Sequence, residues 1–479
     1  MAEKMLKFIS QEKAMPDKRQ ATDRVADFDE IYADFNLQEA EGQASRCSQC
    51  GVPFCQVNCP LHNNIPDWLM LTAENRLQEA YELSSATNTF PEICGRICPQ
   101  DRLCEGNCVI EKGFESVTIG AVEKYVTETA FDEGWVEPIK VNAEREQSVG
   151  IIGAGPAGLA AADLLRRKGY QVVVYDRYDR VGGLMVYGIP GFKLEKDIVE
   201  RRAELLEKGG IKFELNCEIG RDITFDGLRK RHNAVLIATG VYKARDIKVP
   251  GIGLQGVVPA LDYLTASNRK SLGDDVAEFD SGMLNAEGKN VVVIGGGDTA
   301  MDCVRTAIRQ EAKSVTCLYR RDRANMPGSQ REVENAEEEG VNFQWLSAPH
   351  ALLGDKTVGA VRARRIHLGQ PDETGRQVPQ IIDGSDFDID ADLVVKALGF
   401  DPEDLPSLFE QKDLGVSRWG TVQIDWKTMM TQIPGVFAAG DIVRGASLVV
   451  WGIRDGRDAA EQIDAFIEAE LRGETRQVG

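Results

Sequence analysis

Two stretches of the chain share one pattern, and this repeat limits the possible folds more than any other feature. Residues 148–177 read SVGIIGAGPAGLAAADLLRRKGYQVVVYDR, and residues 290–321 read NVVVIGGGDTAMDCVRTAIRQEAKSVTCLYRR. Each contains an apolar strand, a glycine turn, a helix and a second apolar strand, which is the βαβ unit of a parallel sheet covered on both faces. The repeat predicts an α/β fold with two dinucleotide-binding domains.

The first unit has the glycine spacing that a dinucleotide requires. Gly153, Gly155 and Gly158 form G-x-G-x-x-G directly after the first strand. The first glycine permits a tight turn, the second lets a pyrophosphate approach the backbone, and the third lets the helix pack against the strand. Asp176 ends the second strand, where an acid accepts hydrogen bonds from a ribose. The alternative is a glycine turn without a ligand.

The second unit differs from the first at its helix. Gly295 and Gly297 lead into this helix, and Ala300 replaces the third glycine. Asp298 and Thr299 lie at the helix start, where such side chains cap the helix or contact a pyrophosphate. We therefore predict a second dinucleotide site here.

The second strand of the second unit ends in Arg320 and Arg321, where the first unit has an acid. Two guanidinium groups would bind a 2′-phosphate bidentately, whereas an acid would repel it. The alternative is a solvated charge pair at the end of a strand. The two units thus favour different riboses, and we assign FAD to the first unit and NADPH to the second.

A third segment, residues 434–463, reads as a strand, a turn at Gly440-Asp441 and a helix, without a third glycine fingerprint. It is expected to return to the first domain, so that the fold has two Rossmann-like domains with the NADPH domain inserted in the FAD domain. The stretch from about 265 to 288 is polar and is expected to be a linker or surface loop. The expected domains are a helical domain at 1–145, the FAD domain at 146–285 and 401–479, and the NADPH domain at 286–400.

Eight of the 11 cysteines lie in the N-terminal region, which has no long β-pattern. They form C-x2-C-x4-C-x3-C and C-x3-C-x5-C-x3-C, and we expect them in loops between helices. Eight thiolates suit two [4Fe–4S] clusters. The residues are Cys47, Cys50, Cys55 and Cys59 in the first motif, and Cys94, Cys98, Cys104 and Cys108 in the second.

Cys59 precedes a proline, and in two-cluster ferredoxins the cysteine before a proline ligates the other cluster. This rule assigns Cys59, Cys98, Cys104 and one further ligand to one cluster. The other cluster then takes Cys47, Cys50, Cys55 and Cys108. The alternative is two zinc sites in an interaction scaffold, although zinc ribbons usually pair two C-x2-C knuckles and only one occurs here.

Composition excludes several classes of function. A net charge of −20 argues against nucleic-acid binding, because phosphate contacts need concentrated Lys and Arg. No run of 18 apolar residues occurs, so we expect no membrane span, and the charged start lacks the apolar run of a signal peptide. We expect a cytoplasmic protein, in which thiols stay reduced and clustered cysteines bind metal.

Three further motifs resemble the flavoprotein oxidoreductases with two dinucleotide-binding domains. They are Gly182-Gly183, Ala238-Thr239-Gly240 and Gly440-Asp441. The resemblance implies that Gly183, Thr239, Gly240, Gly440 and Asp441 contribute to the FAD site. It also implies that the helix after Asp441 points its N-terminus at the flavin, where a positive dipole end favours the anionic reduced form.

The full set of motifs resembles the small (β) subunits of bacterial NADPH-dependent glutamate synthases over nearly the whole chain. The set is CSQCGVPFCQVNCP, CGRICPQDRLCEGNC, GAGPAG, GGGDTAMD with YRR, and AAGD. The N-terminal module is also similar to that of dihydropyrimidine dehydrogenase and of NADH-dependent ferredoxin:NADP oxidoreductases. These relatives imply that Glu123 is the further cluster ligand and that Cys94 is not one. Cys94 stays the competing ligand, and a surface helix carboxylate is the other interpretation of Glu123.

The resemblance implies an electron-input subunit that oxidises NADPH. Its partner would be a large (α) subunit carrying FMN, which makes L-glutamate from L-glutamine and 2-oxoglutarate. Hydride transfer needs no side-chain acid or base, so we expect no catalytic residue. A ferredoxin:NADP oxidoreductase or a pyrimidine reductase subunit is the alternative, because these enzymes share the module.

Overall fold

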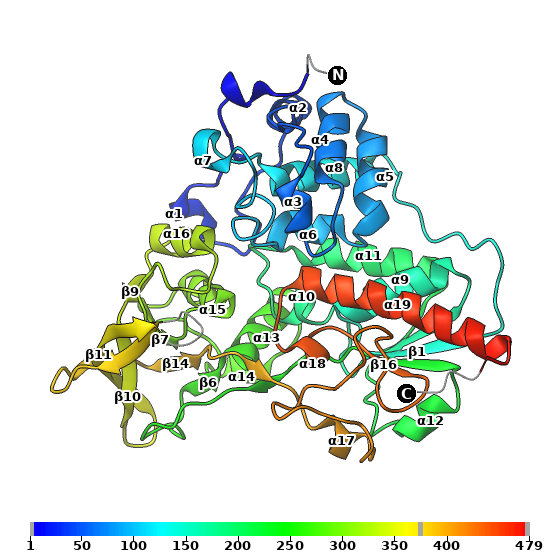
Figure 1. The fold of residues 1–479 in the computed structure, drawn as a ribbon. Helices are drawn as coiled ribbons and strands as arrows, with labels where there is room; N and C mark the ends of the chain where they lie inside the picture. The colour runs from blue at the N-terminus through cyan, green and yellow to red at the C-terminus, as the bar shows by residue number, and fades with distance from the viewer. Residues whose placement is uncertain (1–3, 372–376, 475–479) are drawn as a thin grey trace.

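The computed structural model describes residues 4–371 and 377–474 and consists of three units (Figure 1). A helical N-terminal unit, coloured blue to cyan, lies above two α/β units that are each built on a five-stranded sheet. The predicted fold class is therefore confirmed. No helix within the described residues is long and apolar enough to cross a membrane.

The N-terminal unit, called the cysteine module below, packs its helices around one apolar core. Trp68 and Leu69 of one helix meet Val122 and Val126 of another, and each is at most 1% exposed. These positions recur with the period of amphipathic helices, which explains the packing. The helices are α1 (Ala21–Arg24), α2 (Leu37–Ala44), α3 (Phe54–Val57), α4 (Ile65–Ala73), α5 (Leu77–Thr87), α6 (Pro91–Ile97), α7 (Glu111–Phe114) and α8 (Ile119–Asp132), after a 3₁₀ turn at Lys7–Ile9.

The first α/β unit has the parallel strand order β16-β4-β1-β2-β3. The late strand β16 pairs with β4, so the chain returns to this sheet after completing the second one. The strands are β1 (Ser148–Ile152), β2 (Gln171–Tyr175), β3 (Lys212–Glu214), β4 (Ala234–Ile237) and β16 (Val436–Ala438). The helices are α9 (Pro156–Arg167), α10 (Leu184–Tyr187), α11 (Lys196–Lys208), α12 (Phe225–Arg229), α17 (Leu405–Leu408), α18 (Asp441–Arg444) and α19 (Val449–Leu471).

The second α/β unit has the parallel order β6-β14-β7-β8-β9 and carries a small antiparallel sheet at its outer edge. A two-stranded sheet, β5 (Lys243–Ala244) with β15 (Phe400–Asp401), joins the two units. The parallel strands are β6 (Val257–Pro259), β7 (Asn290–Ile294), β8 (Ser314–Leu318), β9 (Asn342–Gln344) and β14 (Leu393–Lys396). The antiparallel strands are β10 (Ser347–Gly354), β11 (Val358–Pro371), β12 (Gln377–Ile381) and β13 (Phe387–Asp390). The helices are α13 (Ala260–Ser271), α14 (Ala277–Asp280), α15 (Asp298–Arg309) and α16 (Gln330–Glu338).

The second unit begins earlier in the chain than the sequence suggested. Strand β6 pairs with β14, so the boundary expected at residue 285 falls inside this unit. The loop expected over 265–288 was also wrong in part, because α13 extends to Ser271 and α14 follows. Two polar residues of α13 are buried and hydrogen-bonded: Asn268 Nδ2 donates to the Tyr187 carbonyl at 3.0 Å, and Ser267 Oγ accepts from Gln310 Nε2 at 3.0 Å. The polarity of these two residues therefore reflects buried hydrogen bonds within a helix.

The cysteine module is held to both α/β units by ion pairs. Arg202 of α11 contacts Glu92 of α6 at 2.7 Å, and both side chains are almost fully buried. On the other side, Arg24 reaches Glu339 of the second unit at 2.8 Å. These contacts fix the module over the junction between the two sheets.

His232, just before β4, is expected to make the fold sensitive to mild acid. Its Nε2 lies 3.0 Å from the Tyr175 hydroxyl and its Nδ1 lies 3.1 Å from Ser148 Oγ. Burial, with a contribution from Arg231, lowers the pKa of His232 from 6.5 to about 4. A lowered pKa means that the folded chain disfavours the charged form, so stability is lost as the pH falls from 6.5 toward about 4.

The matched variant is His232→Gln, which removes the titration and keeps a polar side chain. Denaturant unfolding of the wild type and the variant at pH about 7.5 and about 5 measures the effect. We expect the wild type to lose more stability than the variant between these pH values. Equal losses in both proteins would contradict the assignment to His232.

Candidate functional site

The first glycine loop, Gly153–Gly158, has no room for a side chain at its first and last glycines but has open space at the middle one. Gly153 has φ +112°, and a Cβ there would lie 2.3 Å from the Ala238 carbonyl oxygen. A Cβ at Gly158 would lie 2.0 Å from the Gly153 carbonyl oxygen, whereas a Cβ at Gly155 would meet nothing within 4 Å. The space beside Gly155 is therefore free for a phosphate at the start of α9.

Polar side chains surround this loop. Asp176 follows β2, and its Oδ2 accepts a hydrogen bond from the Ala154 N–H at 2.7 Å. Burial raises the pKa of Asp441 to about 6, although Ser447 Oγ donates to its carboxylate at 2.6 Å. The hydroxyl of Thr239 is buried and has no hydrogen-bond partner within the described residues. Such an orphaned polar group fits a bound ligand that supplies the partner.

The second glycine loop has the same form. Gly295 has φ +151°, and a Cβ there would lie 2.2 Å from the Ala397 carbonyl oxygen, whereas a Cβ at Gly297 would meet nothing within 4 Å. Asp298 opens α15, and its Oδ1 accepts from the Ser329 N–H at 2.9 Å, so it holds a neighbouring loop and does not cap its own helix. The open space again lies at the second glycine and the helix start.

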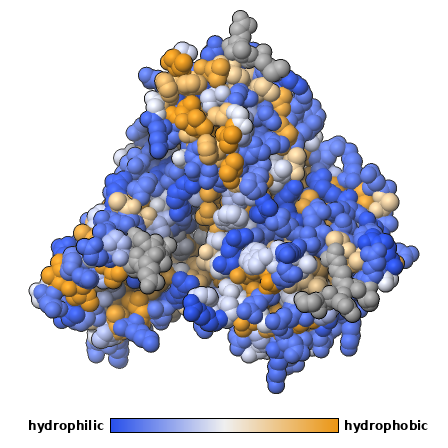
Figure 2. Space-filling model, in the orientation of Figure 1, coloured by the Kyte–Doolittle hydropathy of each residue, from blue (hydrophilic) through white to orange (hydrophobic). Residues whose placement is uncertain are grey.

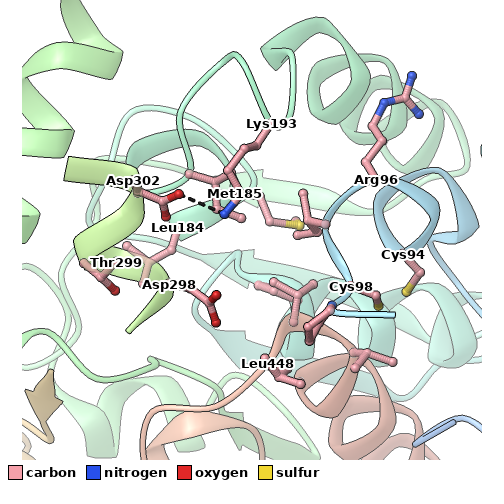
Figure 3. Close-up of a pocket in the computed structure, with 18 of the residues that line it drawn as sticks. Cys94, Arg96, Cys98, Leu184, Met185, Lys193, Asp298, Thr299, Asp302 and Leu448 are labelled. Carbon is pink, nitrogen blue, oxygen red and sulfur yellow. Dashed lines mark hydrogen bonds and ion pairs between the residues drawn. The ribbon is translucent and has the colours of Figure 1, made fainter. Parts of the chain in front are cut away.

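One cavity of about 330 Å³ lies where the three units meet, within the size range of small-molecule sites. Figure 3 shows Asp298 and Thr299 on one side of it, Cys94 and Cys98 on the other, and Leu184 and Met185 between them. The cavity thus lies between the first glycine loop, the start of α15 and the cysteine module. Its lining includes the predicted site residues Gly153, Gly155, Asp176, Thr239, Gly240, Gly440, Asp441, Asp298 and Thr299, with Cys98 and also Cys94.

Other predicted residues do not line this cavity. Arg320 and Arg321 follow β8, and neither guanidinium has a hydrogen bond or ion pair within the described part of the chain. Gly183 packs against the first loop, since a Cβ there would lie 2.9 Å from Gly155 Cα. The residues predicted for the two nucleotide sites that lie outside the lining are Gly158, Gly183, Gly295, Gly297, Arg320 and Arg321. The predicted cluster ligands outside it are Cys47, Cys50, Cys55, Cys59, Cys104, Cys108 and Glu123.

Sequence reasoning missed an ion pair inside the cavity. Lys193 Nζ lies 2.8 Å from Asp302 Oδ1, and the pair joins the first unit to α15 of the second (Figure 3). Asp302 could have been found, because it lies four residues after Asp298 on the same helix face. Lys193 lies in the loop before α11 and no sequence motif marks it.

The first group of thiols is Cys47, Cys50, Cys55 and Cys108. Burial raises the pKa of Cys55 to about 12, and the nearby thiols of Cys47, Cys108 and Cys50 contribute to the rise. Burial likewise raises the pKa of Cys47 to about 11, with Cys108 and Cys50 contributing. Cys108 of the second motif therefore lies near enough to Cys47 and Cys55 of the first to affect their pKa values.

The second group contains Cys59, Cys98, Cys104 and the carboxylate of Glu123. Burial raises the pKa of Cys104 well above its usual value, and Cys59 and Glu123 contribute. A hydrogen bond with Cys94 lowers the pKa of Cys98, but the net shift is upward because Cys98 is buried. The nearby groups of Glu123, Cys104 and Cys59 also raise the pKa of Cys98. Cys55 of the first group also contributes to the rise at Cys104, and the division of the side chains into two ligand sets stays a prediction.

Glu123 and Cys94 are the two candidates for the fourth ligand of the second group. Glu123 Oε1 accepts from Asn88 Nδ2 at 3.1 Å and from Ser84 Oγ at 3.4 Å, and burial raises its pKa to about 8. Cys94 Sγ donates to Asn88 Oδ1 at 3.7 Å. The Glu123 side chain is thus half-buried and hydrogen-bonded within the cysteine module. Cys94 lies in α6 and Cys55 in α3, so the expectation that all the cysteines lie in loops was wrong.

A site for a single metal ion needs several ligand atoms around one point, which differs from the wider spacing of ligands around an iron–sulfur cluster. Among the described residues, no three His, Cys, Asp or Glu side chains are close enough together to hold one metal ion.

Two family models match the chain. The dihydropyrimidine dehydrogenase domain II, 4Fe-4S cluster family matches residues 24–135, and the pyridine nucleotide-disulphide oxidoreductase family matches residues 147–456. The glutamate synthase [NADPH] small chain of Azospirillum brasilense is 66% identical over 468 residues, which cover 98% of this chain and 97% of that protein. The chain belongs to the family of glutamate synthase [NADPH] small chains.

Other comparisons agree with this family. The glutamate synthase [NADPH] small chain of Escherichia coli K12 is 44% identical over 472 residues, covering 98% of this chain and all of that protein. Among solved structures, Mycobacterium tuberculosis FprA in complex with NADPH has a TM-score of 0.59 at 19% identity, covering 70% of this chain and 88% of that chain. The FprA likeness shows the fold of the two α/β units. As a member of the small-chain family, this chain adds the cysteine module to that fold.

Proposed function

We propose that this chain is the cytoplasmic, electron-input subunit of an NADPH-dependent glutamate synthase. The observation that carries the proposal is one cavity lined by the first glycine loop, by Asp298 and Thr299 at the start of α15, and by Cys94 and Cys98. A nucleotide on each loop and a cluster on the cysteine module would meet in this cavity. The high identity to small chains along nearly the whole length supports the same assignment.

We assign FAD to the first unit and NADPH to the second. In this arrangement FAD would accept two electrons as a hydride and release them singly to iron–sulfur clusters. The open space at Gly155 and the orphaned hydroxyl of Thr239 fit a bound dinucleotide in the first unit. The residues proposed for FAD are Gly153, Gly155, Gly158, Asp176, Gly183, Thr239, Gly240, Gly440 and Asp441. Those proposed for NADPH are Gly295, Gly297, Asp298, Thr299, Arg320 and Arg321.

We assign two [4Fe–4S] clusters to the two groups of side chains. Cys47, Cys50, Cys55 and Cys108 would hold the first, and Cys59, Cys98, Cys104 and Glu123 the second. Thiolates are the ligands that such clusters require, and the mutual effects of these side chains on the pKa values of Cys55 and Cys104 support the assignment. Because Cys98 lines the cavity, the second cluster would lie nearer the flavin.

We place the contact with the large, FMN-carrying subunit over the first thiol group. Large apolar side chains are exposed beside it, which is typical of a protein interaction surface. Figure 2 shows apolar side chains gathered on the upper lobe. The side chains are Val52 (61% exposed), Phe54 (50%), Val57 (54%), Val109 (52%) and Phe114 (48%). Electrons would leave through the cluster beneath this surface.

Reconstitution tests the function. Glutamate is expected to form from NADPH, glutamine and 2-oxoglutarate only when this chain is combined with the large synthase subunit. Omission of either chain provides the control. Failure to form glutamate, together with NADPH-dependent reduction of ferredoxin, would favour the ferredoxin:NADP oxidoreductase alternative and overturn the proposal.

Arg320 and Arg321 are expected to set the preference for NADPH. Loss of a hydrogen bond to a charged group costs about 1.5–3 kcal/mol, so replacing both with alanine should raise the KM for NADPH roughly 10- to 100-fold or more. The KM for NADH should stay unchanged, because NADH lacks the 2′-phosphate. Steady-state reduction of an artificial acceptor measures both values.

The matched control is Arg323→Ala, two residues along the same loop. Arg323 is already paired with Glu337 at 2.9 Å, so its loss should leave both KM values unchanged. An unchanged NADPH-to-NADH ratio in the double variant would assign Arg320 and Arg321 to a solvated charge pair.

A further inference from the structure

The loop between Cys98 and Cys104 reaches out of the cysteine module to the second glycine loop. Arg102 Nη2 donates to Asp298 Oδ2 at 3.1 Å, and Arg102 Nη1 donates to the carbonyl oxygen of Pro327. Next to it, Asp101 Oδ1 accepts from Ser329 Oγ at 3.3 Å. A loop that carries two predicted cluster ligands thus contacts the first residue of α15 in the predicted NADPH site.

Asp298 is an unusual residue for that site. It is the first residue of the 12-residue helix α15, directly after the open space at Gly297, and it lines the cavity. A helix N-terminus favours an anion, but a carboxylate there would repel an arriving pyrophosphate. Oδ1 of Asp298 accepts from the Ser329 N–H and Oδ2 accepts from Arg102, which is the charged one of these two partners. Lys193 also attracts Asp298, but its ammonium group is hydrogen-bonded to Asp302.

We propose that Arg102 is a positioning residue for NADPH, acting by neutralising Asp298 at the entrance to the pyrophosphate site. The inference rests on the proposed placement of NADPH at Gly295–Thr299. The cysteine module then takes part in nucleotide binding, although 196 residues separate Arg102 from Asp298. Because coupling between sites is reciprocal, NADP(H) binding would also stabilise the loop between Cys98 and Cys104.

The test measures the dissociation constant of NADP⁺ on the flavin- and cluster-loaded protein by calorimetric titration. Arg102→Ala is expected to weaken binding about tenfold or more, since tenfold corresponds to about 1.4 kcal/mol. In an Asp298→Asn background, where no carboxylate needs neutralising, the same Arg102→Ala change should cost at most about twofold. A merely structural role for Arg102 would give equal losses in the two backgrounds.

Arg76→Ala is the matched control. Arg76 lies in the same module, its side chain is 48% exposed against 40% for Arg102, and it pairs with Glu74 and Glu79. Its loss should leave NADP⁺ binding unchanged. Wild-type affinity in Arg102→Ala, or equal losses in the wild-type and Asp298→Asn backgrounds, would overturn the proposal.

Gly297→Val separates failure of this inference from failure of the proposed site. Gly297 has φ −91° and ψ 179°, which valine adopts without strain, and a side chain there would fill the open space. Loss of NADP⁺ binding in this variant would support the site itself. Wild-type binding in Gly297→Val would overturn the placement of NADPH, and with it the role of Arg102.

Discussion

A chain with Cys98→Ser is expected to be reduced by NADPH at the flavin and yet to form no glutamate with the large subunit. Cys98 directly follows α6 and lines the cavity, so it is the predicted ligand that faces both the flavin site and the second thiol group. Loss of one thiolate should empty the second cluster site. Iron and acid-labile sulfide should fall from about eight each per chain to about four, the content of one [4Fe–4S] cluster.

Three measurements on anaerobically purified protein check this result: iron and sulfide content, bleaching of flavin absorbance by NADPH, and glutamate formation with the large subunit. Cys217→Ser is the control for iron and sulfide content, because Cys217 lies in the first α/β unit, away from both thiol groups. Cys94→Ala tests whether Glu123 or Cys94 is the fourth ligand of the second cluster. The variant should keep about eight iron atoms per chain if Glu123 is that ligand. A full load and full activity in Cys98→Ser would contradict the assignment, and zinc without sulfide in the wild type would favour the scaffold alternative.

The largest loss of stability is expected from Glu339→Ala. The carboxylate of Glu339 accepts hydrogen bonds from Arg24 Nε at 2.8 Å, Arg305 Nη2 at 2.8 Å and Arg309 Nη1 at 2.8 Å. All four side chains are at most 1% exposed. Burial acts to raise the pKa of Glu339, but the guanidinium groups of Arg305 and Arg309 lower it to about 2, so the carboxylate is charged at neutral pH.

Removing this carboxylate leaves three buried guanidinium groups without their shared partner. Breaking a buried ion pair in this way costs about 3–5 kcal/mol. Arg24 belongs to the cysteine module, so the variant should also loosen that module from the second α/β unit. Thermal and denaturant unfolding of the loaded protein measure the effect.

Glu338 provides a matched control from the neighbouring position. Its side chain is 44% exposed and pairs with Lys18 and Arg24. Exposed ion pairs contribute about 0–1 kcal/mol, so Glu338→Ala should change stability by no more than that. Similar losses in Glu338→Ala and Glu339→Ala would contradict the importance of the buried network.

Local patterns in the sequence determined the types of unit from which this protein is built. The strand–glycine–helix–strand repeat predicted two nucleotide units because a glycine turn, a helix start and apolar strands are set by neighbouring residues. The cysteine spacing predicted an iron–sulfur module, which the match of residues 24–135 to a 4Fe-4S cluster family supports. These features depend on short stretches of chain, in which residue type and spacing determine the backbone conformation and the side chains available to a ligand.

Only the tertiary structure decided how the three units combine. Strand β6 joins the second sheet through pairing with β14, which lies far along the chain, so its own residues did not mark the domain boundary. The contact of Arg102 with Asp298 and the convergence of three arginines on Glu339 likewise join residues from separate parts of the chain. Periodicity and motif spacing describe one segment at a time. Such contacts form when whole units pack together. The burial and charge pairing at these surfaces depend on residues from several segments, so no single segment predicts them.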